Sequence, residues 1–211
     1  MNLKKRQLLI VGVMGLLAVI LYRFMPSRTY VNLPPSASGD WVAFGDSLTS
    51  GFGATEGNDY PSVLSRRLGI PIRNYGVTGE TTRDALRRVE QIASLNQQVV
   101  LLCFGGNDSL RSYPPEETYQ NLSQIIDELH AAGSFVVLIG VRSASVFDKN
   151  ESLFKRLAKE KRVFLVGNIL KDVAGHSSRM SDYIHPNDAG YAFIAERLEY
   201  MLRPLLPELR H

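Results

Sequence analysis

Five short apolar runs, bounded by glycine or polar turns, limit this chain to a small set of folds. Runs of this length are typical of buried parallel strands, since helices cover both faces of such strands. In chain order they read WVAFG from Trp41, PIRNYG near residue 71, QVVLLCF ending at Phe104, SFVVLIG ending at Gly140 and RVFLVG ending at Gly167.

The segments between these runs have the apolar spacing of helices. One of them starts with Pro115 at the expected first helical position and is followed by Gly133. We interpret three apolar faces as core-packing stripes: Leu122, Ile125, Ile126 and Leu129; Leu86, Val89 and Ile92; and Ile194, Leu198, Met201 and Leu202. Strands that alternate with helices predict an α/β fold, here a flavodoxin-like doubly wound sheet of five parallel strands. Functional residues are then expected at the carboxyl ends of the strands.

The N-terminal residues predict a membrane anchor over residues 1–25. A basic cluster at residues 4–6 precedes an uncharged apolar run from Leu8 to Tyr22, and with the residues to Met25 this run approaches the ~20 residues that span a bilayer. A cleaved signal peptide is the alternative, but the first small-x-small site, at residues 36–38, lies far downstream. The basic flank places the N-terminus in the cytoplasm. We therefore expect a single-pass inner-membrane protein, inserted through residues 8–25, whose domain faces the periplasm or the cell exterior.

After the anchor we expect a Pro/Ser-rich tether over residues 26–39 and one globular domain over residues 40–211. The formal net charge is +3, but five basic residues and no acidic ones precede residue 30. The remaining 19 basic and 21 acidic residues are nearly balanced, so nothing predicts a nucleic-acid partner. The single cysteine, Cys103, predicts no disulfide framework. We expect the protein to be a monomer.

Four polar clusters follow strands: GDSLTSG at 45–51, NYGVTGET at 74–81, GGNDSLR at 105–111 and SDYIHPND at 181–188. A serine nucleophile needs a base, a group that orients the base, and donors for the oxyanion. Ser47 follows the first strand directly, and Asp182 stands three residues before His185, a spacing at which one turn can join them. Pro186 and Asn187 are expected to open the last helix.

Each of these residues also has a structural interpretation. Ser47 can be a helix N-cap, Asn107 and Asp108 can form an Asx turn, and His185 can cap the last helix beside a surface Asp182. The glycines of GFGATEG at 51–57 are similar to a dinucleotide-binding motif, but the third glycine stands one residue too late.

The other ionisable residues predict no second centre. His130 ends an amphipathic helix, His176 lies in a polar loop and His211 is terminal. No His, Cys, Asp or Glu group has metal-binding spacing, so we expect neither metal nor cofactor.

Gly45-Asp46-Ser47-Leu48, Gly105-Gly106-Asn107-Asp108 and Asp182-x-x-His185-Pro186 together resemble the motifs of the GDSL-type (SGNH) hydrolases and esterases. GGNDSLR followed by PPEETYQNL is most similar to bacterial periplasmic acyl hydrolases with thioesterase and lysophospholipase activity, and to arylesterases. The resemblance covers residues 41 to about 203 and implies the SGNH hydrolase fold.

By this resemblance Ser47 is the nucleophile, His185 the general base and Asp182 the residue that orients it. The implied oxyanion hole comprises the Ser47 N–H, the Asn107 side chain and a glycine N–H of the second cluster. The family pattern favours Gly79 over Gly76 for that glycine.

The function expected from the resemblance is hydrolysis of acyl esters or thioesters, with medium-length chains favoured over acetate. The loops after Leu110, Val141 and Lys171 are expected to shape the acyl pocket. The alternatives are a carbohydrate O-acetylesterase or an O-acyltransferase with the same site, and, more remotely, a tethered binding module without turnover.

Overall fold

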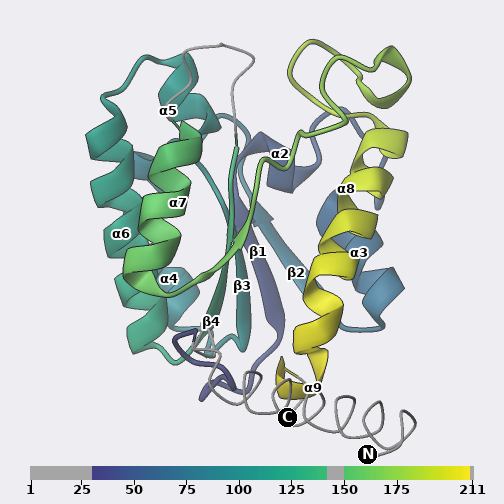
Figure 1. Cartoon of the computed structure of the whole chain (residues 1–211). Helices are drawn as coiled ribbons and strands as arrows, with labels where there is room; N and C mark the ends of the chain where they lie inside the picture. The colour runs from purple at the N-terminus through teal and green to yellow at the C-terminus, as the bar shows by residue number, and fades with distance from the viewer. Residues whose placement is uncertain (1–29, 142–149, 210–211) are drawn as a thin grey trace, which may run out of the picture.

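A computed structural model describes residues 30–141 and 150–209, which form one parallel sheet with helices on both faces (Figure 1). The sheet has the order β2-β1-β3-β4-β5, the doubly wound order expected from the sequence. The strands are β1 (Trp41–Gly45), β2 (Ile72–Gly76), β3 (Val99–Cys103), β4 (Phe135–Ile139) and β5 (Phe164–Val166). The prediction of five parallel strands is therefore confirmed.

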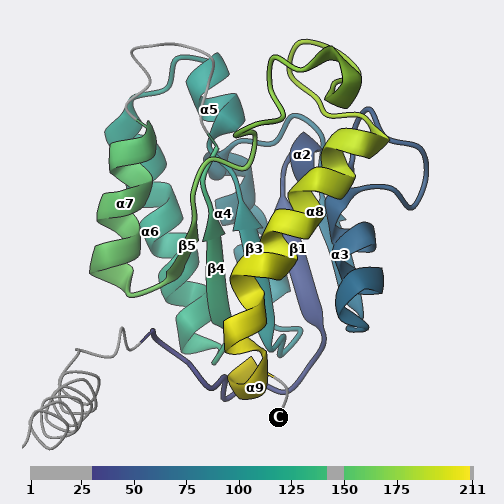
Figure 2. The same cartoon turned by 45° about the vertical axis from the view of Figure 1, so that its right-hand side comes forward.

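Two helical layers cover the sheet, as Figures 1 and 2 show. The helices α4 (Thr82–Ala93), α6 (Pro115–Ala131) and α7 (Asn150–Lys161) cover one face, and α3 (Tyr60–Leu68) and α8 (Asp188–Leu202) cover the other. Shorter elements are α2 (Ser47–Ser50), α5 (Gly106–Leu110), α9 (Leu206–Leu209) and the 3₁₀ turns η1 (Ser177–Arg179) and η2 (Arg203–Leu205).

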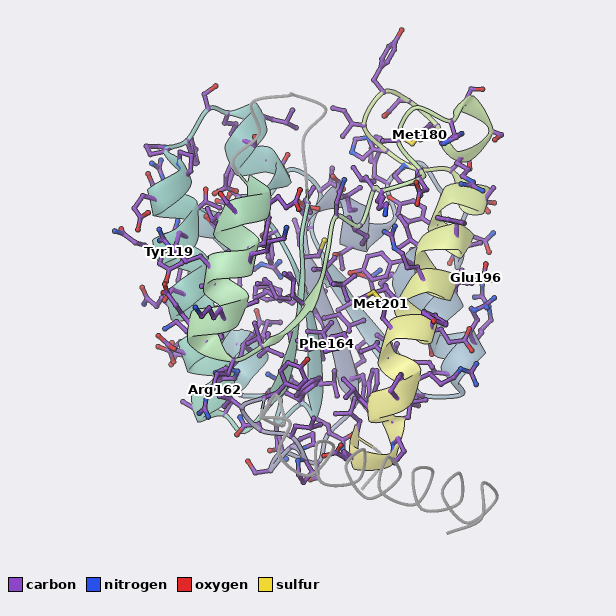
Figure 3. The ribbon with its side chains drawn as sticks, in the orientation of Figure 1. Tyr119, Arg162, Phe164, Met180, Glu196 and Met201 are labelled. Carbon is purple, nitrogen blue, oxygen red and sulfur yellow. The ribbon has the colours of Figure 1, made fainter. Side chains whose placement is uncertain are left out.

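The core has two halves because successive side chains of a strand point to opposite faces. On β1, Ala43 packs with the α3 and α8 side, whereas Val42 and Phe44 pack with the α4, α6 and α7 side. Phe164 of β5 and Met201 of α8 lie in the layer between the sheet and α8 (Figure 3). The central strands β1, β3 and β4 are buried throughout, which explains why they are continuous apolar runs.

The outer strands differ from the expectation of buried strands. The sheet order places β2 at one edge, where Arg73 and Asn74 are exposed, and β5 at the other, where it is only three residues long. An edge strand has a neighbour on one side only, so polar residues are tolerated there.

The described part of the predicted tether packs against the domain at the amino edge of the sheet. The Val31 N–H donates to the Arg162 carbonyl at 3.0 Å, and Asn32 Nδ2 donates to the carbonyls of His130 and Ser134. The Tyr30 ring makes edge-to-face contacts with two phenylalanines, Phe135 and Phe164. A Pro/Ser-rich composition excludes a helix but not these contacts, and the domain boundary at residue 40 stays a prediction.

The predicted anchor over residues 1–25 lies outside the described residues. Among the helices of residues 30–141 and 150–209, none has the length and apolar character needed to cross a bilayer.

Candidate active site

Ser47 lies directly after β1, at the carboxyl edge of the sheet. It is the first residue of α2, and the preceding Asp46 is the N-cap, whose Oδ1 accepts a hydrogen bond from the Leu48 N–H at 3.0 Å. The interpretation of Ser47 as the N-cap is therefore wrong. Within the described ranges the Ser47 N–H has no protein acceptor, because it belongs to the first turn of a helix.

His185 and Asp182 meet Ser47 from the loop before α8. His185 Nε2 lies 3.1 Å from Ser47 Oγ, and His185 Nδ1 lies 2.8 Å from Asp182 Oδ2. Asp182 Oδ1 also accepts the backbone N–H groups of Ile184 and His185, both at 2.7 Å, which closes the turn that joins carboxylate and imidazole. The histidine side chain is 15% exposed and the aspartate side chain 44%.

The Asp182 carboxyl is held in its ionised form. Partial burial raises its pKa, but hydrogen bonds from the His185 ring and from the backbone of His185 and Ile184 outweigh burial, and the pKa is about 2. The carboxylate is therefore charged across the whole neutral range beside the imidazole.

The helix after the histidine begins later than expected. Asn187 is the N-cap of α8, and its Oδ1 accepts the Gly190 N–H at 3.1 Å. Pro186 lies outside the helix, in a bridge with Met180. His185 therefore does not cap the helix, and the corresponding alternative is wrong.

The second cluster reaches the site after β2. The Gly76 N–H already donates to Asn74 Oδ1 at 2.9 Å, whereas within the described residues the Gly79 N–H has no protein acceptor. Of these two glycines, Gly79 is therefore the one whose backbone N–H is free.

Asn107 binds the second cluster through its amide. Its Nδ2 donates to the Glu80 carbonyl at 2.8 Å, which leaves the second N–H of the amide for another acceptor. The neighbouring Asp108 is buried and accepts hydrogen bonds from the N–H and hydroxyl of Thr82. Arg111 adds a contact from its Nη2 to the Gly79 carbonyl at 2.8 Å. These side chains join the third cluster to the second instead of forming an isolated Asx turn.

Burial sets the protonation of Asp46. It raises the pKa of this carboxyl to about 7; the hydrogen bond from Leu48 opposes the rise, and the carboxyl groups of Asp108 and Glu80 add to it.

The other two histidines of the described residues belong to other elements. His130 belongs to α6, where burial lowers its pKa to about 4, and His176 precedes η1. His211 lies outside the described residues. No metal-binding group of three His, Cys, Asp or Glu side chains is present in the described parts of the chain.

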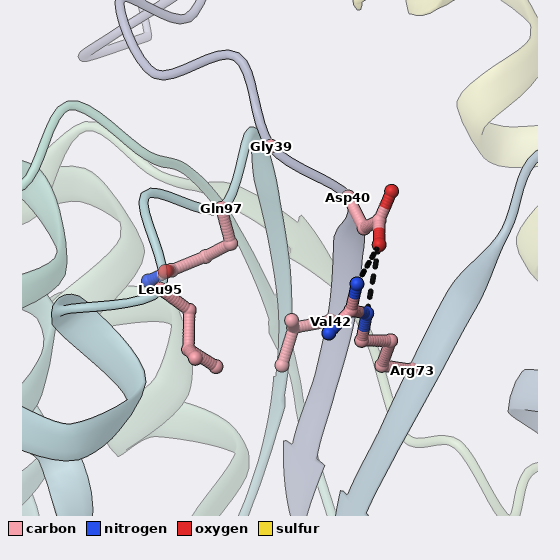
Figure 4. Close-up of a pocket in the computed structure, with 6 residues that line it drawn as sticks. All are labelled: Gly39, Asp40, Val42, Arg73, Leu95 and Gln97. Atoms are coloured by element: carbon pink, nitrogen blue, oxygen red, sulfur yellow. Dashed lines mark hydrogen bonds and ion pairs between the residues drawn. The ribbon is translucent and has the colours of Figure 1, made fainter.

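Among the cavities lined by described residues, two lie at opposite ends of the strands. One, of about 410 Å³, opens at the carboxyl ends of β4 and β5 and is lined by Val141, Phe154, Leu165 and Lys171, among others. The other, of about 270 Å³, lies at the amino end of β1, where Val42, Leu95 and Gln97 face the ion pair of Asp40 and Arg73 (Figure 4). The first adjoins the third cluster, because a Cβ on Gly106 would lie 3.3 Å from Val141 of the cavity wall.

Two aromatic residues of the site escaped the sequence analysis. The Phe52 ring lies 4.5 Å from the His185 ring, and the buried Tyr191 donates from its hydroxyl to the Phe52 carbonyl at 2.9 Å. The glycines on both sides of Phe52 in SGFG are the sequence signal for this turn.

Comparison with known proteins gives a consistent result. Residues 43–193 match the model of the GDSL-like Lipase/Acylhydrolase family. Thioesterase 1/protease 1/lysophospholipase L1 of Escherichia coli (strain K12) is 29% identical over 180 residues, which cover 81% of this chain and 86% of that protein. An arylesterase of Vibrio mimicus is 29% identical over 172 residues, which cover 76% of this chain and 86% of the arylesterase. The crystal structure of TesA superposes with a TM-score of 0.74 at 25% identity, covering 79% of this chain and 99% of TesA.

Proposed function

The chain belongs to the GDSL-like lipase/acylhydrolase family and is an ester hydrolase, and from this premise we propose that Ser47, His185 and Asp182 are its catalytic triad. The observation that carries the proposal is the continuous hydrogen-bonded line from Ser47 Oγ through both ring nitrogens of His185 to Asp182. Ser47 and His185 are 138 residues apart in the chain, so only the fold brings them together.

In the proposed reaction His185 is the general base. With its Nδ1 proton donated to Asp182, its Nε2 accepts the hydroxyl proton of Ser47 as Oγ attacks the acyl carbonyl. The protonated imidazole then donates this proton to the leaving alcohol or thiol. Water, activated by the same nitrogen, releases the acid and regenerates Ser47.

We propose an oxyanion hole formed by the N–H groups of Ser47 and Gly79 and the side chain of Asn107. The free N–H groups of the two backbone donors support this assignment, as does the hydrogen bond from Asn107 to Glu80, which fixes the amide. Donors that are already oriented stabilise the developing charge without reorganisation.

The cavity of about 410 Å³ is the proposed site of the acyl chain. Its wall contains Val141 and Phe154, which approach the Gly106 and Gly105 positions just before Asn107. An acyl chain that extends from the oxyanion hole in this direction contacts these apolar side chains. Val141 and Lys171, the residues at which two of the loops expected to shape the acyl pocket begin, line the cavity.

The proposed substrates are esters or thioesters of medium-length acyl chains. The names of two relatives, a thioesterase and lysophospholipase and an arylesterase, support esters and thioesters as the substrate class. We further propose that the protein is a monomer, anchored in the inner membrane through residues 8–25 with its domain outside the cytoplasm. The apolar run and its basic flank support the anchor.

The test is an assay of the full-length protein, kept in detergent, on nitrophenyl esters from acetate to palmitate, with Ser47→Ala as the blank. We expect activity that depends on Ser47 and is maximal at medium chains. Activity confined to acetate would favour carbohydrate deacetylation, and an active Ser47→Ala protein would refute the triad.

Asn107→Ala tests the oxyanion hole separately. We expect kcat to fall by about 10²–10³ in a folded protein, since one donor to the oxyanion is removed. Asn107→Asp, which keeps the shape but places a carboxylate at the oxyanion, should be impaired at least as strongly. Normal turnover in either variant would contradict the assignment.

A further inference from the structure

The Gly51-Phe52-Gly53 turn holds an aromatic ring against the imidazole of His185. The two ring centroids are 4.5 Å apart, and their planes are tilted by 52°. Phe52 is 49% exposed, so core burial does not explain the presence of a large apolar side chain here. The contact with the histidine is the specific feature of its environment.

The backbone on both sides of Phe52 is locked by close approaches. Gly51 and Gly53 have φ values of +82° and +92°, which residues with a Cβ rarely adopt. A Cβ on Gly51 would overlap Asp59, the N-cap of α3, and a Cβ on Gly53 would overlap Ser181 in the histidine loop. The turn therefore packs tightly between the start of α3 and the loop that carries Asp182 and His185.

Phe52 also connects the serine to the histidine through its own peptide groups. Its N–H donates to the Ser47 carbonyl at 3.0 Å, and its carbonyl accepts the hydroxyl of Tyr191 at 2.9 Å. Tyr191 is fully buried in α8, the helix that starts just after His185. One residue thus touches the Ser47 turn, the His185 ring and the helix behind it.

From this geometry we propose that Phe52 is a positioning residue, which keeps the His185 imidazole aligned with Ser47 Oγ. The inference rests on the proposed triad. The hydrogen bonds to Asp182 and Ser47 are made by the two ring nitrogens, at the edge of the imidazole, whereas the Phe52 ring packs against the imidazole with its centroid 4.5 Å away. When His185 accepts the Ser47 proton it becomes a cation, and an aromatic ring beside a cation is favourable.

The experiment compares Phe52→Ala, Phe52→Leu and Phe52→Tyr in the full chain, with kcat and KM measured separately on one nitrophenyl ester. A misplaced base costs turnover but not substrate binding, so we expect Phe52→Ala to lower kcat by about tenfold or more with KM little changed. Phe52→Tyr keeps the ring and should retain most of kcat, and Phe52→Leu should lie between the two. The rate of inactivation by a serine-reactive phosphonate should follow the same order.

Two further variants distinguish a failure of the Phe52 proposal from a failure of the proposed triad. Tyr200→Ala removes another exposed aromatic, on the outer part of α8, and should leave both constants unchanged. His185→Ala tests the triad itself: residual activity near the wild-type level would refute the proposed function, not Phe52 alone.

If His185→Ala is inactive, three outcomes would contradict the proposed role of Phe52. They are a wild-type kcat in Phe52→Ala, a rise in KM with unchanged kcat, and a Phe52→Tyr protein as slow as Phe52→Ala. Thermal melts accompany each variant, and if Phe52→Ala does not fold, the comparison of Phe52→Leu with Phe52→Tyr decides.

Discussion

Asp46 is buried beside Ser47, where its carboxylate caps the short helix that presents the serine. Its pKa is about 7 in the folded protein, against an ordinary value of 3.8, because burial disfavours the charged form. Between these two pH values the folded protein binds a proton that the unfolded chain has released. The stabilisation from this proton is therefore complete below about pH 4 and is lost as the pH rises to about 7.

Asp46→Asn isolates this effect, because an amide keeps the acceptor for the Leu48 N–H without the charge. We expect the free energy of unfolding of the variant, relative to that of the wild type, to rise by roughly 2–4 kcal/mol between pH 4 and pH 8. Urea unfolding at pH 4, 6 and 8 measures this difference. A difference that does not depend on pH would contradict the assigned ionisation.

Asp182 provides the opposite case, a carboxyl group whose pKa of about 2 keeps it charged at every pH at which the enzyme is assayed. Asp182→Asn retains an acceptor for the backbone of Ile184 and His185 but removes the charge and presents a donor to the imidazole. We expect kcat to fall by roughly 10²–10⁴, since the wrong tautomer of His185 is then favoured.

The matched control for that change is Asp188→Asn. The Asp188 carboxylate binds Thr55 and Asn58 and has no contact with His185. The kcat of Asp188→Asn should stay close to that of wild type, and equal losses in both variants would indicate a general effect of neutralising a carboxylate near the start of α8.

Asp108 connects two elements, because it is carried by α5 and receives hydrogen bonds from the first residue of α4. Asp108→Ala leaves the Thr82 N–H and hydroxyl buried without an acceptor. We expect a loss of about 1–3 kcal/mol in the free energy of unfolding and a lower kcat, because the adjacent Asn107 loses its support.

The control is Asp127→Ala, which removes an exposed carboxylate of α6 that pairs with Lys161. A surface ion pair contributes about 0–1 kcal/mol, so this variant should be nearly as stable as wild type and fully active. Chemical unfolding and steady-state kinetics on both variants test the comparison. A fully active Asp108→Ala protein would show that α5 holds Asn107 without the contact to α4.

The edge strand β5 contributes Leu165 to the wall of the proposed acyl cavity. Leu165→Trp fills part of about 410 Å³ and should move the preferred chain length toward shorter esters, with acetate hydrolysis retained. The ratio of kcat/KM for octanoate and acetate esters is the measurement. An unchanged ratio would exclude this cavity as the acyl site.

At the scale of the whole molecule, the segment before β1 closes the amino edge of the sheet, opposite Ser47 (Figure 1). Tyr30 makes edge-to-face contacts with Phe135 of β4 and Phe164 of β5, at 6.0 and 5.5 Å between ring centroids. Such contacts, together with the buried apolar area of the ring, stabilise the fold.

Tyr30→Ala in the full chain should reduce the free energy of unfolding by about 2 kcal/mol and leave kcat unchanged. This loss is smaller than that for truncating a fully buried aromatic side chain. Tyr200→Ala, at a position 79% exposed, should change stability by less than about 0.5 kcal/mol. Thermal and urea unfolding of both proteins check this. Equal stability of the two variants would mean that the Tyr30 ring contributes nothing to the stability of the fold.

The amino-acid sequence by itself determined the five parallel strands, the helices between them and the edge at which Ser47, Asn107 and His185 gather. These features follow from local patterns: apolar runs and helical periodicity need only neighbouring residues, and parallel connections bring the ends of strands together.

Tertiary structure alone decided which atoms meet at that edge and at the opposite one. The bond from Asn107 to Glu80, the contact of Phe52 with His185 and the packing of Tyr30 on Phe135 all join segments distant in the chain. No period or composition encodes such contacts, because they depend on how several elements pack at once.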